Sequence, residues 1–329
     1  MAPMIGLLPD IPEPTFECGY SASDPYCTEK GGDCKPRASD ERNSFESLYT
    51  LVHRIDVLLD PIALENFMQS FVGYGNLVSD VWFIGMEEGG GVTENEVRAR
   101  LEAWGNRGQL QIEDVREFHI AGQQIQNTQQ IAIPLEGALT NRLDQCFVPA
   151  APLQFTWERI IRFVRANGEL NFDPEEMRQY QIRHLARPDS NLAILELFPL
   201  PSPGSRQWNY GPVGRQKDPA NAYPAVAWTG LVYLQSRSSY HRQVYEARRD
   251  LLRGLIELHA PQAVVFYGES FRKKWWDIAR LVIPKSDYQL HGAGVTRYMI
   301  LPHPNAHGVS TNLVFQRAGL TLRAAGIVL

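Results

Sequence analysis

Apolar residues along this chain gather in four short, uninterrupted runs, at residues 81–84, 192–195, 263–268 and 298–301. Strands with continuous apolar runs, rather than alternating polar positions, are typical of parallel sheets buried on both faces. Between the runs, apolar residues recur at helical spacing. The pattern therefore predicts an α/β fold with a mainly parallel sheet. Helices are expected at about 44–60, 61–72, 94–104, 112–126, 156–167, 174–185, 240–259, 271–281 and 313–325.

Residues 1–43 differ from the rest of the chain in composition. They are rich in Pro, Gly, Ser and Asp and show no regular apolar pattern. We expect an irregular N-terminal arm over residues 1–43, followed by one α/β domain over residues 44–329.

Two of the apolar runs end in loops that carry reactive side chains. The first breaks into Gly85-Met86-Glu87-Glu88 and then three glycines, which would let backbone approach a ligand closely. The last breaks into Pro302-His303-Pro304, a stiff loop with a histidine suited to charge near neutral pH. Open α/β sheets bind ligands at the carboxyl ends of their strands. The alternatives are a flexible glycine turn with solvated acids and a surface turn with a solvated histidine.

These loops and a third segment resemble the uracil-DNA glycosylase superfamily, most closely its single-strand-selective monofunctional and mismatch-specific branches. Gly85-Met86-Glu87-Glu88-Gly89 is similar to their Gly-Met-Asn-Pro-Gly, and His303-Pro304-Asn305-Ala306 is similar to His-Pro-Ser-Pro. Leu195-Glu196-Leu197-Phe198-Pro199-Leu200 is similar to His-Asn-Leu-Cys-Pro-Leu. Three motifs in the same order, each after an apolar run, are more specific than any one alone.

The resemblance implies a three-layer sandwich around a central, mainly parallel four-stranded sheet, with a helical insertion at about 93–185. It also implies a monofunctional DNA glycosylase, in which Glu87 serves the attacking water and His303 contacts the base oxygen as charge builds. Glu196 stands where the superfamily reads the pyrimidine edge with an Asn. The substrate-binding residues implied are Gly85, Met86, Glu88, Gly89, Gly90, Glu196 and Phe198.

Two departures from the uracil-reading pattern bear on the substrate. Gly89, with the two glycines after it, stands where strict uracil enzymes place a bulky Tyr that rejects a methyl group at C5. Glu196, if ionised, accepts a hydrogen bond from the amine of cytosine but offers nothing to O4 of uracil. We therefore expect excision of a C5-modified cytosine, or another modified or damaged pyrimidine, in base excision or in defence against modified phage DNA.

The net charge of −5 conceals an uneven distribution along the chain. Residues 1–204 carry 16 basic and 30 acidic residues, a net of −14, whereas residues 205–329 carry 16 basic and 7 acidic residues, a net of +9. A basic half, and a loop that mixes basic and aromatic residues, favour nucleic-acid binding. The alternatives are ion pairs between the halves and a surface loop pinned by its Trp. The expected DNA contacts are Arg206, Trp208, Arg215, Lys217, Asn305, His307 and Ser310.

The four cysteines lack the usual spacing of a metal site. Cys18, Cys27 and Cys34 lie near the N-terminus and Cys146 far from them, with no Cys-x-x-Cys. We expect no cofactor and no metal, with an iron–sulfur cluster or zinc on these four residues as the alternative. No apolar run reaches membrane length and no signal pattern opens the chain, so we expect a cytoplasmic monomer with DNA as partner and no membrane attachment.

Two other function classes fit the same residues. One is a catalytically silent DNA-binding module on the same fold, because a fold does not settle function. The other is an unrelated α/β hydrolase or transferase that uses Glu87 and Glu88 as metal ligands. Dependence of activity on a metal separates the last class from a glycosylase.

Overall fold

The computed structural model describes residues 60–132, 143–204, 207–211, 230–282, 288–292, 294–306 and 310–329. The predicted N-terminal arm lies outside this range, as does the helix expected at 44–60 apart from Asp60. The strands are β1 (Gly73–Tyr74), β2 (Val81–Gly89), β3 (Ile112–Glu113), β4 (Leu192–Ser202), β5 (Ala263–Tyr267) and β6 (Arg297–Leu301). The helices are α2 (Pro61–Ser70), α3 (Glu94–Asn106), α4 (Val115–Ala132), α5 (Phe155–Asn167), α6 (Pro174–Arg183), α7 (Arg237–His259), α8 (Arg272–Ala279) and α9 (Thr311–Ala324). Single 3-10 turns are η1 (Leu143–Cys146), η5 (Val232–Gln235) and η6 (Glu269–Phe271).

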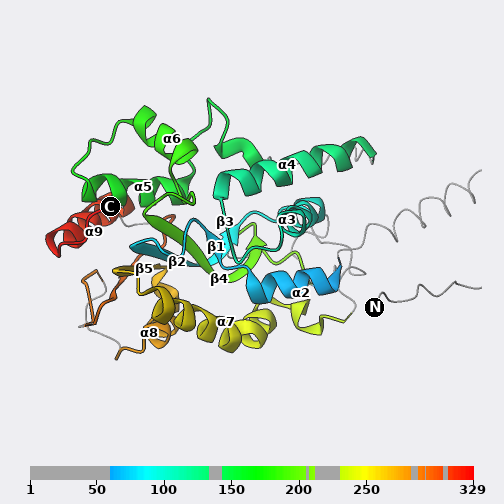
Figure 1. The fold of residues 1–329 in the computed structure, drawn as a ribbon. Helices are drawn as coiled ribbons and strands as arrows, with labels where there is room; N and C mark the ends of the chain where they lie inside the picture. Colours follow the sequence, from blue (N-terminus) through cyan, green and yellow to red (C-terminus); the bar gives the residue numbers. More distant parts are fainter. Residues whose placement is uncertain are drawn as a thin grey trace, which may run out of the picture. The chain divides into compact units, whose positions relative to one another are not determined.

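The fold is α/β, and its sheet is mixed and six-stranded, in the order β3-β1-β4-β2-β5-β6 (Figure 1). Strands β4, β2, β5 and β6 are mutually parallel, whereas β1 runs antiparallel to β4 and parallel to β3. The sequence-based expectation of four strands is therefore too low. Strands β1 and β3 have two residues each, which is too short to leave a periodic pattern.

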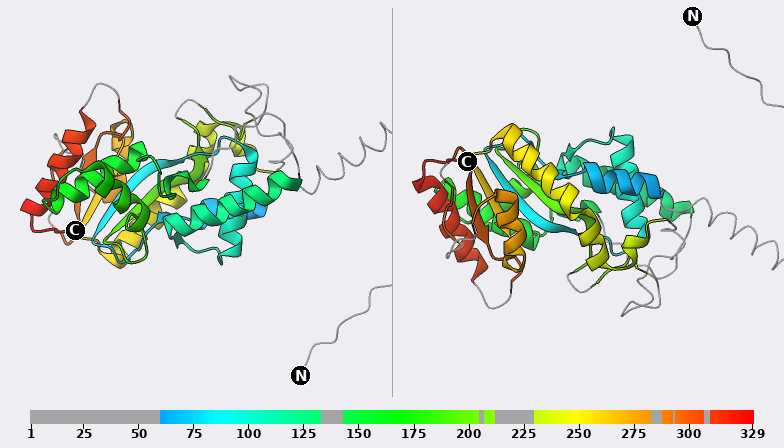
Figure 2. Two further views of the ribbon diagram at one scale, coloured as in Figure 1. Left: turned by 90° about the horizontal axis from the view of Figure 1, so that it is seen from above. Right: turned by 90° about the horizontal axis from the view of Figure 1, so that it is seen from below.

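Helices cover both faces of this sheet. Helices α5 and α9 lie with α6 on one face, and α7 and α8 lie on the other, as the two opposite views in Figure 2 show. All residues of β4 and β5 are buried, as are the first six of β2. The double coverage explains why these strands read as uninterrupted apolar runs.

Two predicted strands continue beyond their apolar runs. Strand β2 extends to Gly89 and β4 to Ser202, in register from Val81 opposite Leu192 as far as Glu87 opposite Phe198. The acids predicted to lie in loops are thus strand residues. Successive side chains of a strand point to opposite faces, so Glu87 and Glu88 meet different surroundings.

The eight predicted helices that fall within the described residues are confirmed, with starts that differ from the predicted ones by up to three residues. The helix expected from residue 112 begins at Val115, because the Asp114 carboxylate accepts hydrogen bonds from the amides of Arg116 and Glu117, at 3.0 Å each. A side chain that satisfies the first free amides of a helix fixes where the helix begins. The two residues before Asp114 pair with β1 instead.

Helices α5 and α9 pack backbone to backbone at Gly319. A Cβ at this position would lie well inside contact distance of the Phe163 carbonyl oxygen and 3.0 Å from its carbon. We expect Gly319→Ala to destabilise the fold by about 1–3 kcal/mol, because backbone on both helices would have to move. Gly254→Ala, on α7 with nothing within 4 Å of the new Cβ, is the matched control. Chemical denaturation should show a loss for Gly319→Ala only, and equal stability of the two variants would contradict the close packing.

Candidate active site

The carboxyl ends of the parallel strands bring together most of the residues that the sequence singles out. Gly85 of β2 lies opposite Glu196 of β4, and Glu87 lies opposite Phe198. Strand β5 ends at Tyr267, beside β6, which delivers His303 two residues after its end. Residues far apart in sequence thus meet at the carboxyl ends of the parallel strands, where such folds bind ligands.

The Glu87 carboxylate is held by two side chains of helix α7. Its Oε1 lies 2.5 Å from Nε2 of His241, and its Oε2 lies 3.4 Å from the guanidinium of Arg237. The His241 ring stacks on Phe198, with centroids 3.9 Å apart and planes 9° from parallel. Stacking and ion pairing together fix the position of the carboxylate.

The Glu88 carboxylate points into a different environment. It accepts hydrogen bonds from the Tyr74 hydroxyl at 2.5 Å and from Arg100 at 2.6 Å, with Nε2 of His119 at 3.6 Å. Burial alone would raise the pKa of Glu88, but the Arg100 charge and the hydrogen bonds from His119 and Tyr74 lower it to about 2. The predicted substrate contact is thus part of an ion cluster beneath the surface, and its contacts are those of a supporting residue.

The glycine loop after β2 is anchored to helix α3 by hydrogen bonds. Glu96 accepts hydrogen bonds from the amides of Gly91 at 2.8 Å and Val92 at 2.9 Å, and it lies 3.2 Å from Arg100. The Asn209 amide donates to the Gly91 carbonyl at 3.2 Å. The same ion cluster that holds Glu88 therefore also holds the loop, which makes the loop a fixed wall.

Gly89 and Gly85 differ in how much space surrounds them. A Cβ on Gly89 would meet nothing within 4 Å, so this part of the wall borders open space. A Cβ on Gly85 would overlap the Tyr267 hydroxyl and lie 2.6 Å from Oε2 of Glu196. Glu196 and Tyr267 therefore pack directly against the β2 backbone, which only glycine permits at residue 85.

His303 is set up as a neutral hydrogen-bond donor. Its Nδ1 accepts the amide proton of Asn305 at 3.1 Å, so the proton of the neutral ring sits on Nε2. Burial lowers the pKa of His303, which favours the neutral form near pH 7. The ring lies edge-on to Tyr267, with centroids 6.1 Å apart. The structure thus places a donor of fixed tautomer beside the Glu196–Tyr267 pair.

The predicted DNA contacts are only partly described. Arg206, Arg215, Lys217 and His307 lie outside the described residues. Asn305 and Ser310 are exposed beside the His303 loop, as a DNA contact requires.

Trp208 instead helps to hold its loop in place. Its indole N–H donates to the Leu234 carbonyl at 2.8 Å, its ring stacks on Tyr240 at 5.1 Å, and the Arg237 guanidinium lies over it at 5.7 Å. These contacts favour the alternative of a loop pinned by its Trp.

Helix α7 contributes fewer free charges than its sequence indicates. Arg248 is buried and donates to the backbone carbonyls of Glu196 and Leu197. Arg253 pairs with Asp277 at 2.7 Å, and Arg249 pairs with Asp250 at 2.8 Å. Arg249 and Arg253 thus pair with acids of their own half, residues 205–329, whereas the pair of Arg237 with Glu87 joins the two halves, as the alternative interpretation of the charge asymmetry expects.

Sequence reasoning missed the partners that hold the acids. His241 and Arg237 lie on α7, about 150 residues after Glu87 in the chain, and Arg100 and His119 lie on α3 and α4. Tyr267 is visible in the sequence only as the last apolar residue of a strand. An amphipathic helix with a His and an Arg one turn apart, at 241 and 237, is the one signal that could have indicated an acid partner.

The described part of the chain contains no group of three or more His, Cys, Asp or Glu side chains arranged to hold a metal ion. Cys146 is buried with a free thiol, and burial raises the pKa of that thiol to about 11, so it is not poised as a thiolate ligand. The other three cysteines lie outside the described residues. Among the helices that can be described, none has the length and apolar character needed to cross a membrane.

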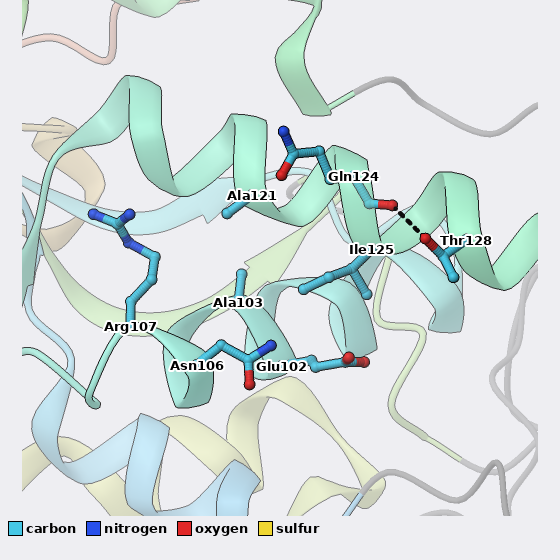
Figure 3. A pocket seen from close by; sticks show the side chains of 8 residues that line it. All are labelled: Glu102, Ala103, Asn106, Arg107, Ala121, Gln124, Ile125 and Thr128. Carbon is cyan, nitrogen blue, oxygen red and sulfur yellow. Dashed lines mark hydrogen bonds between the residues drawn. The ribbon is translucent and has the colours of Figure 1, made fainter.

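An open groove of about 360 Å³ lies between helices α3 and α4 (Figure 3). Its walls are formed by Glu102, Ala103, Asn106, Arg107, Ala121, Gln124, Ile125 and Thr128. None of the site residues inferred from the sequence lines this groove.

Comparison with known proteins adds no family to this picture. No protein-family model matches the chain, and no curated protein shows significant sequence similarity to it.

Proposed function

We propose that this chain is a monofunctional DNA glycosylase that hydrolyses the N-glycosidic bond of a flipped-out pyrimidine. The observation that carries the proposal is the tautomer of His303, a neutral Nε2–H donor at the same sheet edge as the ion-paired carboxylate of Glu87. A departing base gains negative charge on its oxygen while the sugar gains positive charge. A fixed donor on one side and a fixed carboxylate on the other match that charge separation.

In the proposed reaction, water attacks C1′ of the deoxyribose as the bond from C1′ to the base nitrogen breaks. The electron pair of that bond leaves with the base. Glu87 orients the water and takes its proton, and the Nε2–H of His303 stabilises the charge on the base oxygen. The base must leave the helical stack to reach this edge, and the segment after His303 is proposed to fill the gap it leaves.

The resemblance to uracil-DNA glycosylases supports the same assignment. The four mutually parallel strands β4, β2, β5 and β6 would correspond to the central sheet of that superfamily, with β1 and β3 added at one edge. Helices α3 and α4 then fall within the proposed insertion at about 93–185, where α3 braces the glycine loop.

The proposed substrate carries a substituent at C5. The open space beside Gly89 supports this, because a wall without a side chain can border a bulky group. The sequence argument for cytosine depends on an ionised Glu196 that faces the base edge, whereas both carboxylate oxygens of Glu196 are buried against Gly85 and Tyr267. The proposal therefore covers modified cytosine and modified uracil, and substrate measurements decide between them.

Of the two alternatives, the metal-dependent hydrolase has less support from the contacts. Glu87 already pairs with Arg237 and His241, and Glu88 with Arg100. Each carboxylate would have to give up a cationic partner to bind a metal. The silent DNA-binding module differs from a glycosylase only in lacking turnover, so an excision assay separates the two.

The deciding test is excision from a panel of duplexes that differ only in one base. The panel contains uracil, thymine, cytosine and C5-methyl, C5-hydroxymethyl and C5-glucosylated cytosine, and alkali cleaves the strand wherever a base has been removed. We expect cleavage of at least one C5-substituted substrate, with a chelator present, and a rate lower by roughly 100-fold or more with Glu87→Gln. No cleavage of any duplex and of any single strand would reject the proposal.

Binding to DNA should weaken steeply with salt, because phosphate contacts release condensed counterions. Because several arginines on α7 already have partners within the fold, fewer basic residues are free to bind phosphate. We expect log affinity to fall with log salt concentration at the slope of about three to five phosphate contacts, less than the full basic excess would give. Fluorescence anisotropy of a labelled duplex between about 50 and 200 mM salt measures it. Affinity that stays constant over this range would contradict a DNA-binding role for residues 205–329.

A further inference from the structure

Glu196 is the most deeply placed acid at the carboxyl ends of the strands. The residue is 5% exposed, and its Oε1 accepts one hydrogen bond, from the Tyr267 hydroxyl at 3.0 Å. Its Oε2 is buried and has no hydrogen-bond partner among the described residues. A buried carboxylate with one neutral donor is poorly compensated, because ionised groups in protein interiors are normally paired and fully hydrogen-bonded.

Among the described residues, no Lys, Arg or His side chain forms an ion pair with the Glu196 carboxyl group. The nearest buried guanidinium, Arg248, donates to the backbone carbonyls of Glu196 at 2.8 Å and Leu197 at 3.0 Å, not to the carboxylate. Arg100 is shared by Glu88 and Glu96, and Arg237 pairs with Glu87. Around the described site, two guanidinium groups thus face three other carboxylates, and Glu196 is the fourth acid.

Charged and titratable groups on the neighbouring elements also influence the pKa of Glu196. The charged and titratable groups that act electrostatically on Glu196 are Glu87 and Glu88 on β2, Tyr74 on β1, Tyr267 on β5 and Arg248 on α7. Burial, followed by the negative charge of Glu88, raises the pKa of Glu196 well above its usual range. The Tyr267 hydrogen bond and the Arg248 charge lower the pKa, and Glu87 raises it, so burial and the two acids prevail.

We propose that Glu196 works as a neutral carboxylic acid, with its proton on Oε2, and keeps the floor of the site free of negative charge where the departing base becomes anionic. The inference rests on the proposed glycosylase function and makes Glu196 a positioning residue rather than a contact to the base. A second carboxylate below the base would oppose charge on the base oxygen, whereas a neutral acid does not. The substrate class that fits is a pyrimidine that departs as an anion.

The expected consequence is a loss of turnover on the alkaline side. As pH rises through the raised pKa, Glu196 ionises and the floor gains the charge that opposes departure. In Glu196→Gln, a permanently neutral group of the same shape removes this alkaline fall, whatever the absolute rate of the variant. In Tyr267→Phe, the bond that favours the ionised form is lost, so the fall should move to higher pH.

Infrared difference spectroscopy and pH–rate profiles test the two parts separately. Wild-type protein in water at about pH 7 should show the carbonyl band of a protonated carboxylic acid, which should be missing from Glu196→Gln and present in the exposed control Glu257→Gln. Single-turnover excision from about pH 6 to about pH 10 should show an alkaline fall in wild type and the control, and none in Glu196→Gln.

Each outcome supports or overturns one part of the inference about Glu196. No protonated band that depends on Glu196 overturns the inference, even if excision occurs. If the band is present but the alkaline fall in turnover persists unchanged in Glu196→Gln, the proposed role of Glu196 in turnover is overturned. Absence of excision from every duplex removes the proposed function and the role that rests on it, while the band still establishes or rejects the neutral acid by itself.

Discussion

Replacing Glu87 by Gln is expected to lower single-turnover excision by roughly 100-fold or more, with the fold and DNA binding retained. Gln keeps the shape of the side chain, and its one carbonyl oxygen can still accept from one of the two residues that hold Glu87, Arg237 at 3.4 Å and His241 at 2.5 Å. It cannot take a proton from water, and it removes the negative charge near the sugar. The effect should therefore fall on the chemical step rather than on binding.

His303→Ala is expected to cost a similar factor by removing the donor to the base oxygen. His303→Gln, which retains a donor, should lose less. Matched controls are Glu175→Gln, an exposed acid paired with Arg178, and His184→Ala, whose ring contacts Tyr180 at the end of α6. Single-turnover rates and anisotropy on one duplex measure both effects. Rates of Glu87→Gln or His303→Ala within a few-fold of wild type would remove that residue from the mechanism.

The fold class could be predicted because its central strands are covered on both faces. Val81–Ile84 and Ala263–Phe266 are fully buried, and burial of this kind produces the uninterrupted apolar runs that mark parallel strands. Strands β1 and β3 could not be predicted in the same way. Strand β1 pairs with the edge of β4, and β3 pairs with β1. Both pairings depend on tertiary contacts, which leave no local pattern in the sequence.

The position of the candidate site could be predicted from the sequence, but the ion-pair and hydrogen-bond partners of its acids could not. Glu87 and Glu88 are adjacent and chemically identical in the sequence, yet they lie on opposite faces of β2. Glu87 therefore meets His241 and Arg237 on α7, whereas Glu88 meets Arg100 on α3. Which partners each acid meets depends on which helix packs on which face, and the sequence around the two acids carries no information about that.

Replacing Arg100 by Met is expected to be the most destabilising single change near the site, at about 3–5 kcal/mol. The Arg100 side chain is 6% exposed and binds Glu88 at 2.6 Å and Glu96 at 3.2 Å, which are 11% and 1% exposed. Removing the guanidinium leaves two buried carboxylates without their cation. Since Glu96 also holds the Gly91 and Val92 amides, the glycine loop should loosen together with the fold.

The pH dependence of stability gives an independent check on this cluster. The pKa of Glu88 is lowered to about 2, so its contribution to stability is fully present above its unfolded value of about 4.5 and is lost as pH falls toward about 2. Glu88→Gln should remove that part of the acid dependence. The protonation of Glu196 works in the opposite direction, since a raised pKa makes wild type lose stability relative to Glu196→Gln as pH rises above about 4.5.

Urea denaturation of Arg100→Met, Glu88→Gln and the double variant measures the coupling directly. The double variant should be more stable than the sum of the single losses predicts, because Glu88→Gln removes one of the charges that Arg100→Met leaves unpaired. Arg178→Met, which breaks an exposed pair with Glu175 on α6, is the control and should cost no more than about 1 kcal/mol. If Arg100→Met cost as little as this control, the cluster would be a surface feature, and the glycine loop would need another explanation for its fixed position.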